Sequence, residues 1–163
     1  MNFTQRRAES ADEGFLFLLY TSTRADEIAA WGWDETQQTV FLEQQFSARE
    51  SQYRSIYPDA LHQIILMGNE PIGRILTSVG ATEICLVDIA ILPNRRGAGI
   101  GARLIRDLLL RAKTLGKAVV LSVTRDNRAA GLYERLGFVV TADDGVYLGM
   151  RWDPATISHQ RSK

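Results

Sequence analysis

The feature that most constrains the fold is an apolar strand pattern followed by a glycine-rich loop and an amphipathic helix pattern. EICLVDIAILP (residues 83–93) is short, mostly apolar and rich in β-branched residues, which predicts a strand. RRGAGIG (95–101) follows, and GARLIRDLLLRAKTLGK (101–117) predicts a helix with one apolar face that ends at Gly116. Glycines let a ligand approach main-chain N–H groups, and a helix that begins just after them favours an anion. A phosphate-bearing ligand is therefore the first hypothesis.

Three kinds of phosphate site are compatible with a strand, a glycine loop and a helix. A Walker A loop is excluded because no lysine followed by serine or threonine comes after the glycines. Gly97, Gly99 and Ala102 match the GxGxxG/A pattern of a dinucleotide-binding loop, so that alternative remains open. This loop fits poorly, because in the dinucleotide-binding fold the strand leads directly into the first glycine, whereas LPNRR lies between them here. Only about a third of the chain follows Gly101, which is too little for the second half of such a sheet. The third kind of site accounts for the arginine as well as the glycines.

Two motifs resemble the GCN5-related N-acetyltransferase (GNAT) family. RGAGIG (96–101) is similar to the R/Q-x-x-G-x-G/A loop of that family, whose backbone N–H groups hold the pyrophosphate of acetyl-CoA. DNRAAGLYERLGFVV (126–140) is similar to the closing motif that follows the fifth strand, although Asn127 precedes Tyr133 by six residues where many members have seven. The motifs occur in the family's order and at its approximate separation, and the resemblance covers roughly residues 64–140.

The resemblance implies an α/β (α+β) architecture of the GNAT type. We expect a mixed, mostly antiparallel central sheet of about six to seven strands with helices on both faces and with the fourth and fifth strands splayed apart. Residues 1–153 are expected to form a single acetyltransferase domain. Residues 154–163 are expected to be a mobile C-terminal tail.

Local patterns predict the elements outside the two motifs. Ser10 and Glu13 predict a capping box for a helix at about 11–22, which a polar turn, STRADE, would end. A second helix is predicted from Asp34 to about Tyr53. The apolar residues expected on the buried sides of these helices are Phe15, Leu16, Leu18 and Leu19 in the first, and Val40, Phe41 and Ala48 in the second.

The resemblance also implies how acetyl-CoA, the expected co-substrate, is bound. The backbone of the fourth strand is expected to pair with the pantetheine arm, and a main-chain N–H near Ile89 to stabilise the oxyanion. Tyr133 is the expected general acid toward the leaving thiolate. The predicted acetyl-CoA contacts are Ile89, Ala90, Ile91, Arg96, Gly97, Ala98, Gly99, Ile100, Gly101, Ala102, Asn127 and Tyr133.

Glu83 is the candidate for the base that accepts the proton of the amine. It lies on the strand that is expected to hold the thioester, and by strict alternation its side chain points to the same face as that of Ile89. It would therefore reach the amine through water if no bulge interrupts the strand. A solvated carboxylate is the ordinary role of such a residue, and an amine with a pKa near neutrality needs no protein base. Tyr133 has an ordinary alternative too, as a core aromatic beside Leu132 and Leu136.

In this family the first two helices and the final hairpin line the acceptor site. By resemblance, Trp31, Trp33 and Tyr147 are the candidate substrate residues, with Tyr53 and Tyr57 as further members of an aromatic wall. Aromatic faces attract a cationic amine, although most aromatic residues pack in a core. WGW (31–33) is the exception, because a glycine between two tryptophans in a loop predicts exposure.

Composition limits the partners of the 163-residue chain. Nineteen Lys and Arg residues balance nineteen Asp and Glu residues, which does not favour nucleic acid or a membrane surface. A single cysteine and the lack of a Cys/His cluster give no pattern for a disulfide or a metal. MNFTQRRAES lacks the apolar core of a signal peptide, and FLFLLY is too short to span a bilayer, so the cytoplasm is the expected location.

The leading hypothesis is therefore a cytoplasmic, acetyl-CoA-dependent N-acetyltransferase. Its acceptor would be a primary amine of a small molecule or of a protein, which attacks the thioester directly. A non-catalytic CoA-binding module and, with less support, an NAD(P)-dependent oxidoreductase remain alternatives. A homodimer is compatible with the fold.

Overall fold

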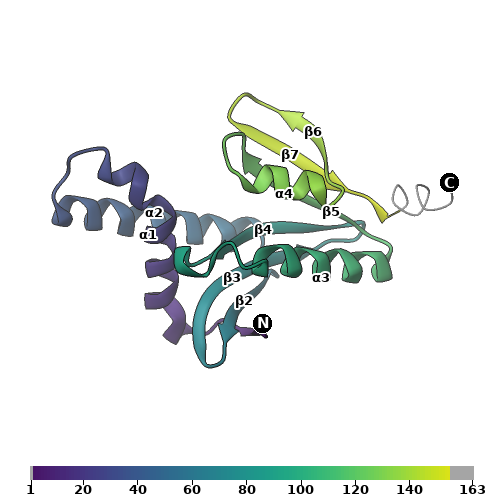
Figure 1. The fold of residues 1–163 in the computed structure, drawn as a ribbon, viewed down its shortest axis with the longest axis horizontal. Coiled ribbons are helices and arrows are strands. Elements are labelled where there is room, and N and C mark those ends of the chain that lie inside the picture. The colour runs from purple at the N-terminus through teal and green to yellow at the C-terminus, as the bar shows by residue number, and fades with distance from the viewer. Residues whose placement is uncertain (1, 155–163) are drawn as a thin grey trace. The chain divides into compact units, whose positions relative to one another are not determined.

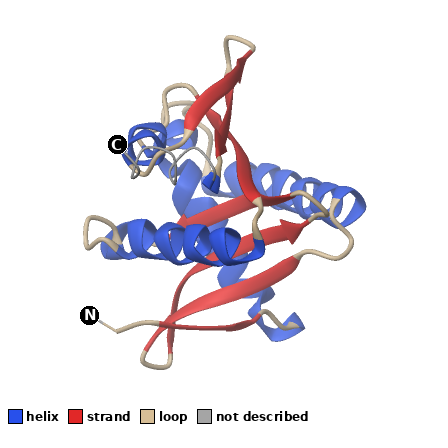
Figure 2. Cartoon of the chain, turned by 90° about the vertical axis from the view of Figure 1, so that its right-hand side faces the viewer, coloured by secondary structure: helices blue, strands red, loops and turns tan. Residues whose placement is uncertain are grey.

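The computed structural model describes residues 2–154, which form a seven-stranded sheet flanked by helices (Figures 1 and 2). In chain order the elements are β1 (Thr4–Arg7), η1 (Ser10–Asp12), α1 (Glu13–Ala29), α2 (Glu35–Ile56), β2 (Leu61–Met67), β3 (Glu70–Val79), β4 (Glu83–Ile91), η2 (Pro93–Arg95), α3 (Ile100–Leu115), β5 (Ala118–Thr124), α4 (Ala129–Arg135), β6 (Val139–Asp143) and β7 (Tyr147–Trp152). The strand order is β1-β2-β3-β4-β5-β7-β6. Strands β4 and β5 are parallel, so the predicted mixed sheet is confirmed. The tail predicted at 154–163 falls, from residue 155 on, outside the described residues.

The chain divides into two compact units, each made of two separate segments. The first unit combines the chain up to Leu76 with Asp88–Ala98, and the second combines Thr77–Val87 with the chain from Gly99 onward. Two of the three divisions fall inside strands, because β3 continues past Leu76 and β4 continues past Val87, and the third falls in the glycine loop, between Ala98 and Gly99. No helix among the described residues is long and apolar enough to cross a membrane.

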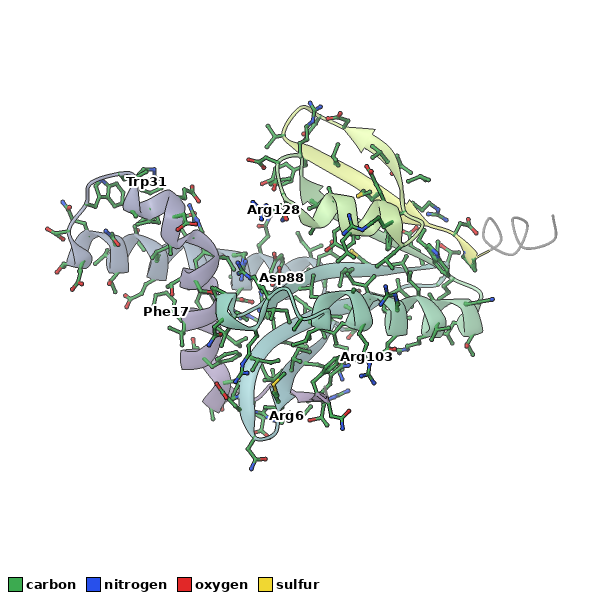
Figure 3. All side chains as sticks on the ribbon, in the orientation of Figure 1. Arg6, Phe17, Trp31, Asp88, Arg103 and Arg128 are labelled. Carbon is green, nitrogen blue, oxygen red and sulfur yellow. The ribbon has the colours of Figure 1, made fainter. Side chains whose placement is uncertain are left out.

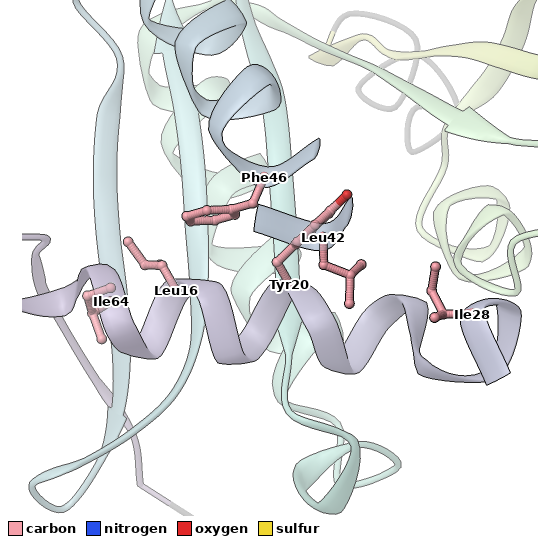
Figure 4. Packing of buried hydrophobic residues seen from close by; sticks show 6 residues of the cluster. All are labelled: Leu16, Tyr20, Ile28, Leu42, Phe46 and Ile64. Atoms are coloured by element: carbon pink, nitrogen blue, oxygen red, sulfur yellow. The ribbon is translucent and has the colours of Figure 1, made fainter. Parts of the chain in front are cut away.

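The core of the first unit lies where α1 packs on α2 and on the neighbouring strand β2. Its buried members are Leu16, Tyr20, Ile28, Leu42, Phe46 and Ile64 (Figure 4). Phe46 contacts the Tyr20 ring at a centroid distance of 5.5 Å and the Phe17 ring, edge-on, at 5.6 Å. Aromatic pairs of this geometry add to the stabilisation that burial alone provides.

Three predictions about these helices were wrong. The STRADE segment does not turn but continues α1 to Ala29, because the hydroxyls of Thr21, Ser22 and Thr23 donate to carbonyls three residues earlier in the same helix. The capping box is formed by Glu9 and Asp12 rather than by Ser10 and Glu13. Of the expected buried faces, Leu18 is 58% exposed and Val40 is 50% exposed.

The second unit is built around β5, which both α3 and α4 contact. The predicted helix α3 is confirmed, with Leu104, Ile105, Leu108, Leu109 and Ala112 buried on one face. Leu115 was expected on that face and is exposed, since it is the last residue of the helix before the left-handed Gly116. Strand β7 pairs antiparallel with β5 and with β6, which leaves β6 at the edge of the sheet.

An ion pair fixes the start of α1 to the first strand. Both terminal nitrogens of Arg6 donate to the carboxylate of Asp12 at 2.8 Å, and the Glu9 N–H donates to Asp12 Oδ2 at 2.7 Å. These hydrogen bonds, that of Arg6 foremost, lower the pKa of Asp12 to about 2. A depressed carboxyl pKa means that the ionised form stabilises the folded state at any pH above the unfolded value.

We expect Asp12→Asn to lower the free energy of unfolding by about 1–2 kcal/mol at pH 7, because a buried charge-assisted pair is lost while Arg6 stays partly hydrated. The stabilising contribution is complete above pH about 4 and falls as the pH drops through about 2. Urea unfolding of wild type and variant across that range measures the difference. A difference that stays constant down to pH 2 would contradict the assigned role of the ionised carboxylate.

Candidate functional site

The glycine loop between β4 and α3 has a backbone that favours an anion. Gly97 and Gly99 adopt positive φ angles of 79° and 83°, and Gly99 is the N-cap residue of α3. A glycine N-cap has no side chain to accept hydrogen bonds from the first helical turn. The N–H groups of Ile100, Gly101 and Ala102 therefore begin a 16-residue helix without a capping side chain. The residues present at this helix start suit a phosphate group.

The end of β4 is held in place within the first unit. Arg96 donates from Nε to the carbonyl of Ile91 at 2.9 Å, and the Leu92 N–H donates to the carbonyl of Ile72 in β3 at 2.8 Å. Arg95 pairs with Glu70 at 3.0 Å, which anchors η2 to the start of β3. Arg96 thus has a structural partner of its own, in addition to the phosphate role predicted for it.

The parallel ladder between β4 and β5 is short. Within the second unit it joins Glu83, Ile84 and Cys85 to Ala118, Val119 and Val120. Along its other edge, β5 pairs with β7 from Val119 to Thr124. The limited ladder agrees with the predicted splaying of the fourth and fifth strands, which in this family exposes strand backbone to the pantetheine arm.

Glu83 lies at the paired beginning of β4. Its carboxylate binds Arg151 of β7 at 2.9 Å, and both side chains are about half exposed. Six residues separate it from Ile89, which corresponds to about 20 Å of extended strand. Its role as a base stays a prediction, and the hydrogen bond shows that the carboxylate has a structural partner.

Tyr133 and Asn127 both belong to the segment around α4. The Tyr133 side chain is buried and packs on Phe138 at a ring distance of 5.5 Å. Asn127 accepts a hydrogen bond from the Ala129 N–H through its side-chain oxygen at 2.9 Å, so it caps the start of α4. The motif residues thus also stabilise this short helix.

The tryptophans of the α1–α2 turn are exposed, as the WGW sequence predicted. Trp31 is 40% exposed and Trp33 is 38% exposed (Figure 3 labels Trp31). They pack edge-to-face on each other and on Phe41, at centroid distances of 5.1–5.4 Å. Tyr147 is half exposed at the start of β7 in the second unit.

A buried polar network next to the expected thioester strand was missed in the sequence. Arg74 of β3 is 1% exposed, and its Nε donates to Asp88 of β4 at 2.7 Å. Arg74 Nη1 lies 2.7 Å from Glu50 of α2, in the geometry of an ion pair rather than an aligned hydrogen bond. The available signal was a lone charge in the apolar strand pattern IGRILTSV.

The network shifts the pKa values of the groups around it. Burial disfavours the Arg74 charge, but Asp88 and Glu50 outweigh this effect and raise the pKa of Arg74 above its ordinary value. Burial raises the pKa of Tyr53, and Asp88 adds to that effect. Burial, followed by the charge of Arg74, lowers the pKa of His62, so its ring is neutral at pH 7. Asp88, which directly precedes Ile89, lies 2.7 Å from the Nε of this buried arginine.

Comparison with known proteins identifies the family. A sequence model of the acetyltransferase (GNAT) domain matches residues 58–140, about half of the chain, and the chain belongs to this family. The [ribosomal protein bS18]-alanine N-acetyltransferase of Haemophilus influenzae is 35% identical over 75 residues, which cover 45% of this chain. That match spans 51% of the Haemophilus protein, so the alignment covers about half of its length.

Solved structures show the same fold at low identity. PaiA N-acetyltransferase from Thermoplasma acidophilum, crystallised with coenzyme A, superposes with a TM-score of 0.70 at 20% identity, over 94% of this chain and 99% of that one. A spermidine N-acetyltransferase SpeG chimera from Vibrio cholerae and hSSAT gives a TM-score of 0.67 at 20% identity, over 96% and 98% of the two chains. These similarities confirm the predicted GNAT architecture.

The loop geometry predicts opposite effects on stability when Gly99 and Gly101 are each replaced by alanine. Gly99→Ala is expected to lower the free energy of unfolding by about 1–2 kcal/mol, because alanine is strained at its positive φ. Gly101→Ala lies inside α3 with open space around the added Cβ, so it should raise stability by about 0.5–1 kcal/mol. Urea unfolding of the ligand-free variants separates the two. Equal effects at both positions would argue against the left-handed N-cap.

Proposed function

We propose that the protein is an acetyl-CoA-dependent N-acetyltransferase that transfers the acetyl group to a primary amine. The observation that carries the proposal is the glycine loop between β4 and α3 in a chain of the GNAT family. Its glycines have positive φ angles, and no side chain caps the first N–H groups of α3. The proposed contacts of acetyl-CoA are the backbone of Ile89–Ile91, the loop from Arg96 to Ala102, and Asn127 and Tyr133 of the closing motif. No cluster of potential metal ligands occurs among residues 2–154.

The reaction follows from the chemistry of a thioester. The amine nitrogen attacks the carbonyl carbon, negative charge develops on the carbonyl oxygen, the carbon–sulfur bond breaks, and the thiolate accepts a proton while the amide loses one. A main-chain N–H near Ile89 would stabilise the oxyanion. Because this donor belongs to the backbone, replacing a side chain does not remove it. The carbonyl of Ile91 accepts a hydrogen bond from Arg96 Nε at 2.9 Å, which holds this end of the strand by a contact within the protein.

Tyr133 is the proposed general acid. A phenol donates a hydrogen bond that strengthens as charge grows on the departing sulfur. Its packing on Phe138 supports this role, because a buried ring holds its hydroxyl in one place. Glu83 is proposed as the base only through a relay of several water molecules, because about 20 Å of strand separates it from Ile89, and an acceptor that is deprotonated near neutral pH needs no base.

The acceptor is proposed to be an amine of a small molecule or of a protein. The names of similar proteins support both, since one is an alanine N-acetyltransferase of a ribosomal protein and another is a spermidine N-acetyltransferase. Trp31, Trp33 and Tyr147 are the proposed aromatic contacts of the acceptor. On the basis of the family, we also propose a cytoplasmic location, one functional domain over residues 1–153, and a homodimer.

Calorimetric titration tests the donor. CoA-stripped protein is expected to bind acetyl-CoA with a micromolar dissociation constant and to give no response to NADH in the same buffer. Binding of NADH in place of acetyl-CoA would support the dinucleotide alternative and refute the proposal. Binding of acetyl-CoA without turnover of any amine in a library would support the non-catalytic CoA-binding module.

Tyr133→Phe tests the general acid. We expect kcat to fall about 100-fold, with acetyl-CoA affinity unchanged, because the ring and its packing are kept and only the hydroxyl is lost. Phe138→Leu is the matched control, since it disturbs the same packing but keeps the phenol. A Tyr133→Phe enzyme with wild-type kcat, or a Phe138→Leu enzyme with the same loss, would show that Tyr133 serves the core.

A further inference from the structure

Gly73 of β3 lies against the part of β4 that is proposed to pair with acetyl-CoA. It is buried, and a Cβ added to it would overlap the carbonyl oxygen of Ala90. The same Cβ would lie 2.7 Å from Cδ1 and 3.2 Å from Cα of Ile91. Two of these three atoms belong to the backbone, so a side-chain rotation cannot remove the overlap. Atoms of β4 therefore occupy the space that a side chain at position 73 would need.

This close approach is the reason for a glycine at position 73. Its φ angle is not in the left-handed region, so the backbone conformation does not require a glycine. Glycine in the interior of a strand weakens the strand, and it often marks a place where another backbone comes close. At two other strand or loop glycines, Gly80 and Gly149, the nearest atom to an added Cβ is 3.1 Å and 3.2 Å away, and neither position shows such an overlap.

The two neighbours of the glycine fix β4 on either side of this contact, within the first unit. The carbonyl of Ile72 accepts a hydrogen bond from the Leu92 N–H at 2.8 Å. On the other side, Arg74 Nε donates to Asp88 at 2.7 Å, and Figure 3 labels Asp88. The three residues between these two points are those whose backbone is proposed to pair with the pantetheine arm. Their path depends on the room that Gly73 leaves.

The contact also sets the direction of one peptide group. The C=O and the N–H of a trans peptide point in opposite directions. Because the carbonyl oxygen of Ala90 lies against Gly73 of β3, the N–H of Ile91 points away from β3. Pairing of a strand with an extended ligand depends on such main-chain groups and on their alignment. A methyl group at position 73 would displace the carbonyl and turn this N–H with it.

We propose that Gly73 is a positioning residue for acetyl-CoA. Its missing side chain lets the Ala90 carbonyl lie against β3, and this directs the backbone of β4 toward the pantetheine arm. The inference rests on the proposed function and deepens it. Gly73 touches no ligand itself and acts only through the backbone of Ala90 and Ile91.

Titration calorimetry with two ligands tests this role. Acetyl-CoA carries the pantetheine arm, whereas 3′-phospho-ADP is the nucleotide part of coenzyme A alone and would bind at the start of α3. Gly73→Ala is expected to weaken the binding of acetyl-CoA about tenfold, which corresponds to the loss of about one hydrogen bond. Its affinity for 3′-phospho-ADP should equal that of the wild type. A role in the fold alone would leave the ratio of the two affinities unchanged.

Gly149→Ala is the matched control. Gly149 lies in β7, and an added Cβ there would be 3.2 Å from the Cβ of Ala142, so the variant also crowds a strand. It is expected to keep the wild-type affinity for both ligands. The same selective loss of acetyl-CoA binding in Gly149→Ala would overturn the proposal, because crowding of any strand would then suffice.

Ile91→Ala provides a second background, which also keeps the proposal testable if Gly73→Ala alone does not fold. It removes the Cδ1 atom near position 73 but leaves the Ala90 carbonyl in place. Gly73→Ala/Ile91→Ala is expected to bind acetyl-CoA about tenfold more weakly than Ile91→Ala, again with no change for 3′-phospho-ADP. Equal acetyl-CoA affinities of these two variants would overturn the proposal and assign the effect to side-chain crowding.

The wild-type titration separates this inference from the proposed function. A wild-type protein that binds no acetyl-CoA would refute the proposed function, and this inference with it. A wild-type protein that binds acetyl-CoA, together with Gly73→Ala variants that lose no affinity or lose it equally for both ligands, would overturn only the role of Gly73.

Discussion

The buried guanidinium of Arg74 is the interaction on which the first unit depends. Removing an arginine from water costs several kcal/mol, and only well-placed opposite charges offset that cost. Asp88 from β4 and Glu50 from α2 supply them, each at 2.7 Å, so one side chain of β3 joins a neighbouring strand to a helix. Arg49 of α2, which is next to Glu50, lies over the rings of Tyr20 and Tyr53 in cation–π contacts. Loss of either carboxylate would remove half of the charge that compensates the buried guanidinium, so the three elements are fixed together.

The network connects two regions of the first unit. Asp88 directly precedes the strand backbone proposed to pair with acetyl-CoA, and Glu50 lines a cavity of about 600 Å³ in the first unit. Arg74 therefore orders both through shared ion pairs within one unit. The start of α3 is ordered by a different means, the conformation of two glycines, and needs no charge of its own.

Sequence patterns predicted those parts of the structure that depend on local periodicity. Strand β4 follows from a short apolar run rich in β-branched residues, and helix α3 follows from its one apolar face. The end of α1 was missed because the hydroxyls of Thr21 and Ser22 donate hydrogen bonds to carbonyls of the same helix. A polar composition alone does not reveal such bonds. The buried face of α2 was missed because only Leu42 and Phe46 mark it among many polar residues. Arg74 and the cavity were missed because their partners are distant in the sequence, and packing alone brings them together.

The course of β3 and β4 has a consequence for any fragment of the chain. Each strand begins in one unit and ends in the other, so the first unit obtains its last strand segment, Asp88–Ala98, only after the chain has passed through the second. A fragment that stops at Leu76 would lack Asp88, and its arginine would have lost half of its compensating charge. No single cut of the backbone therefore releases either unit whole.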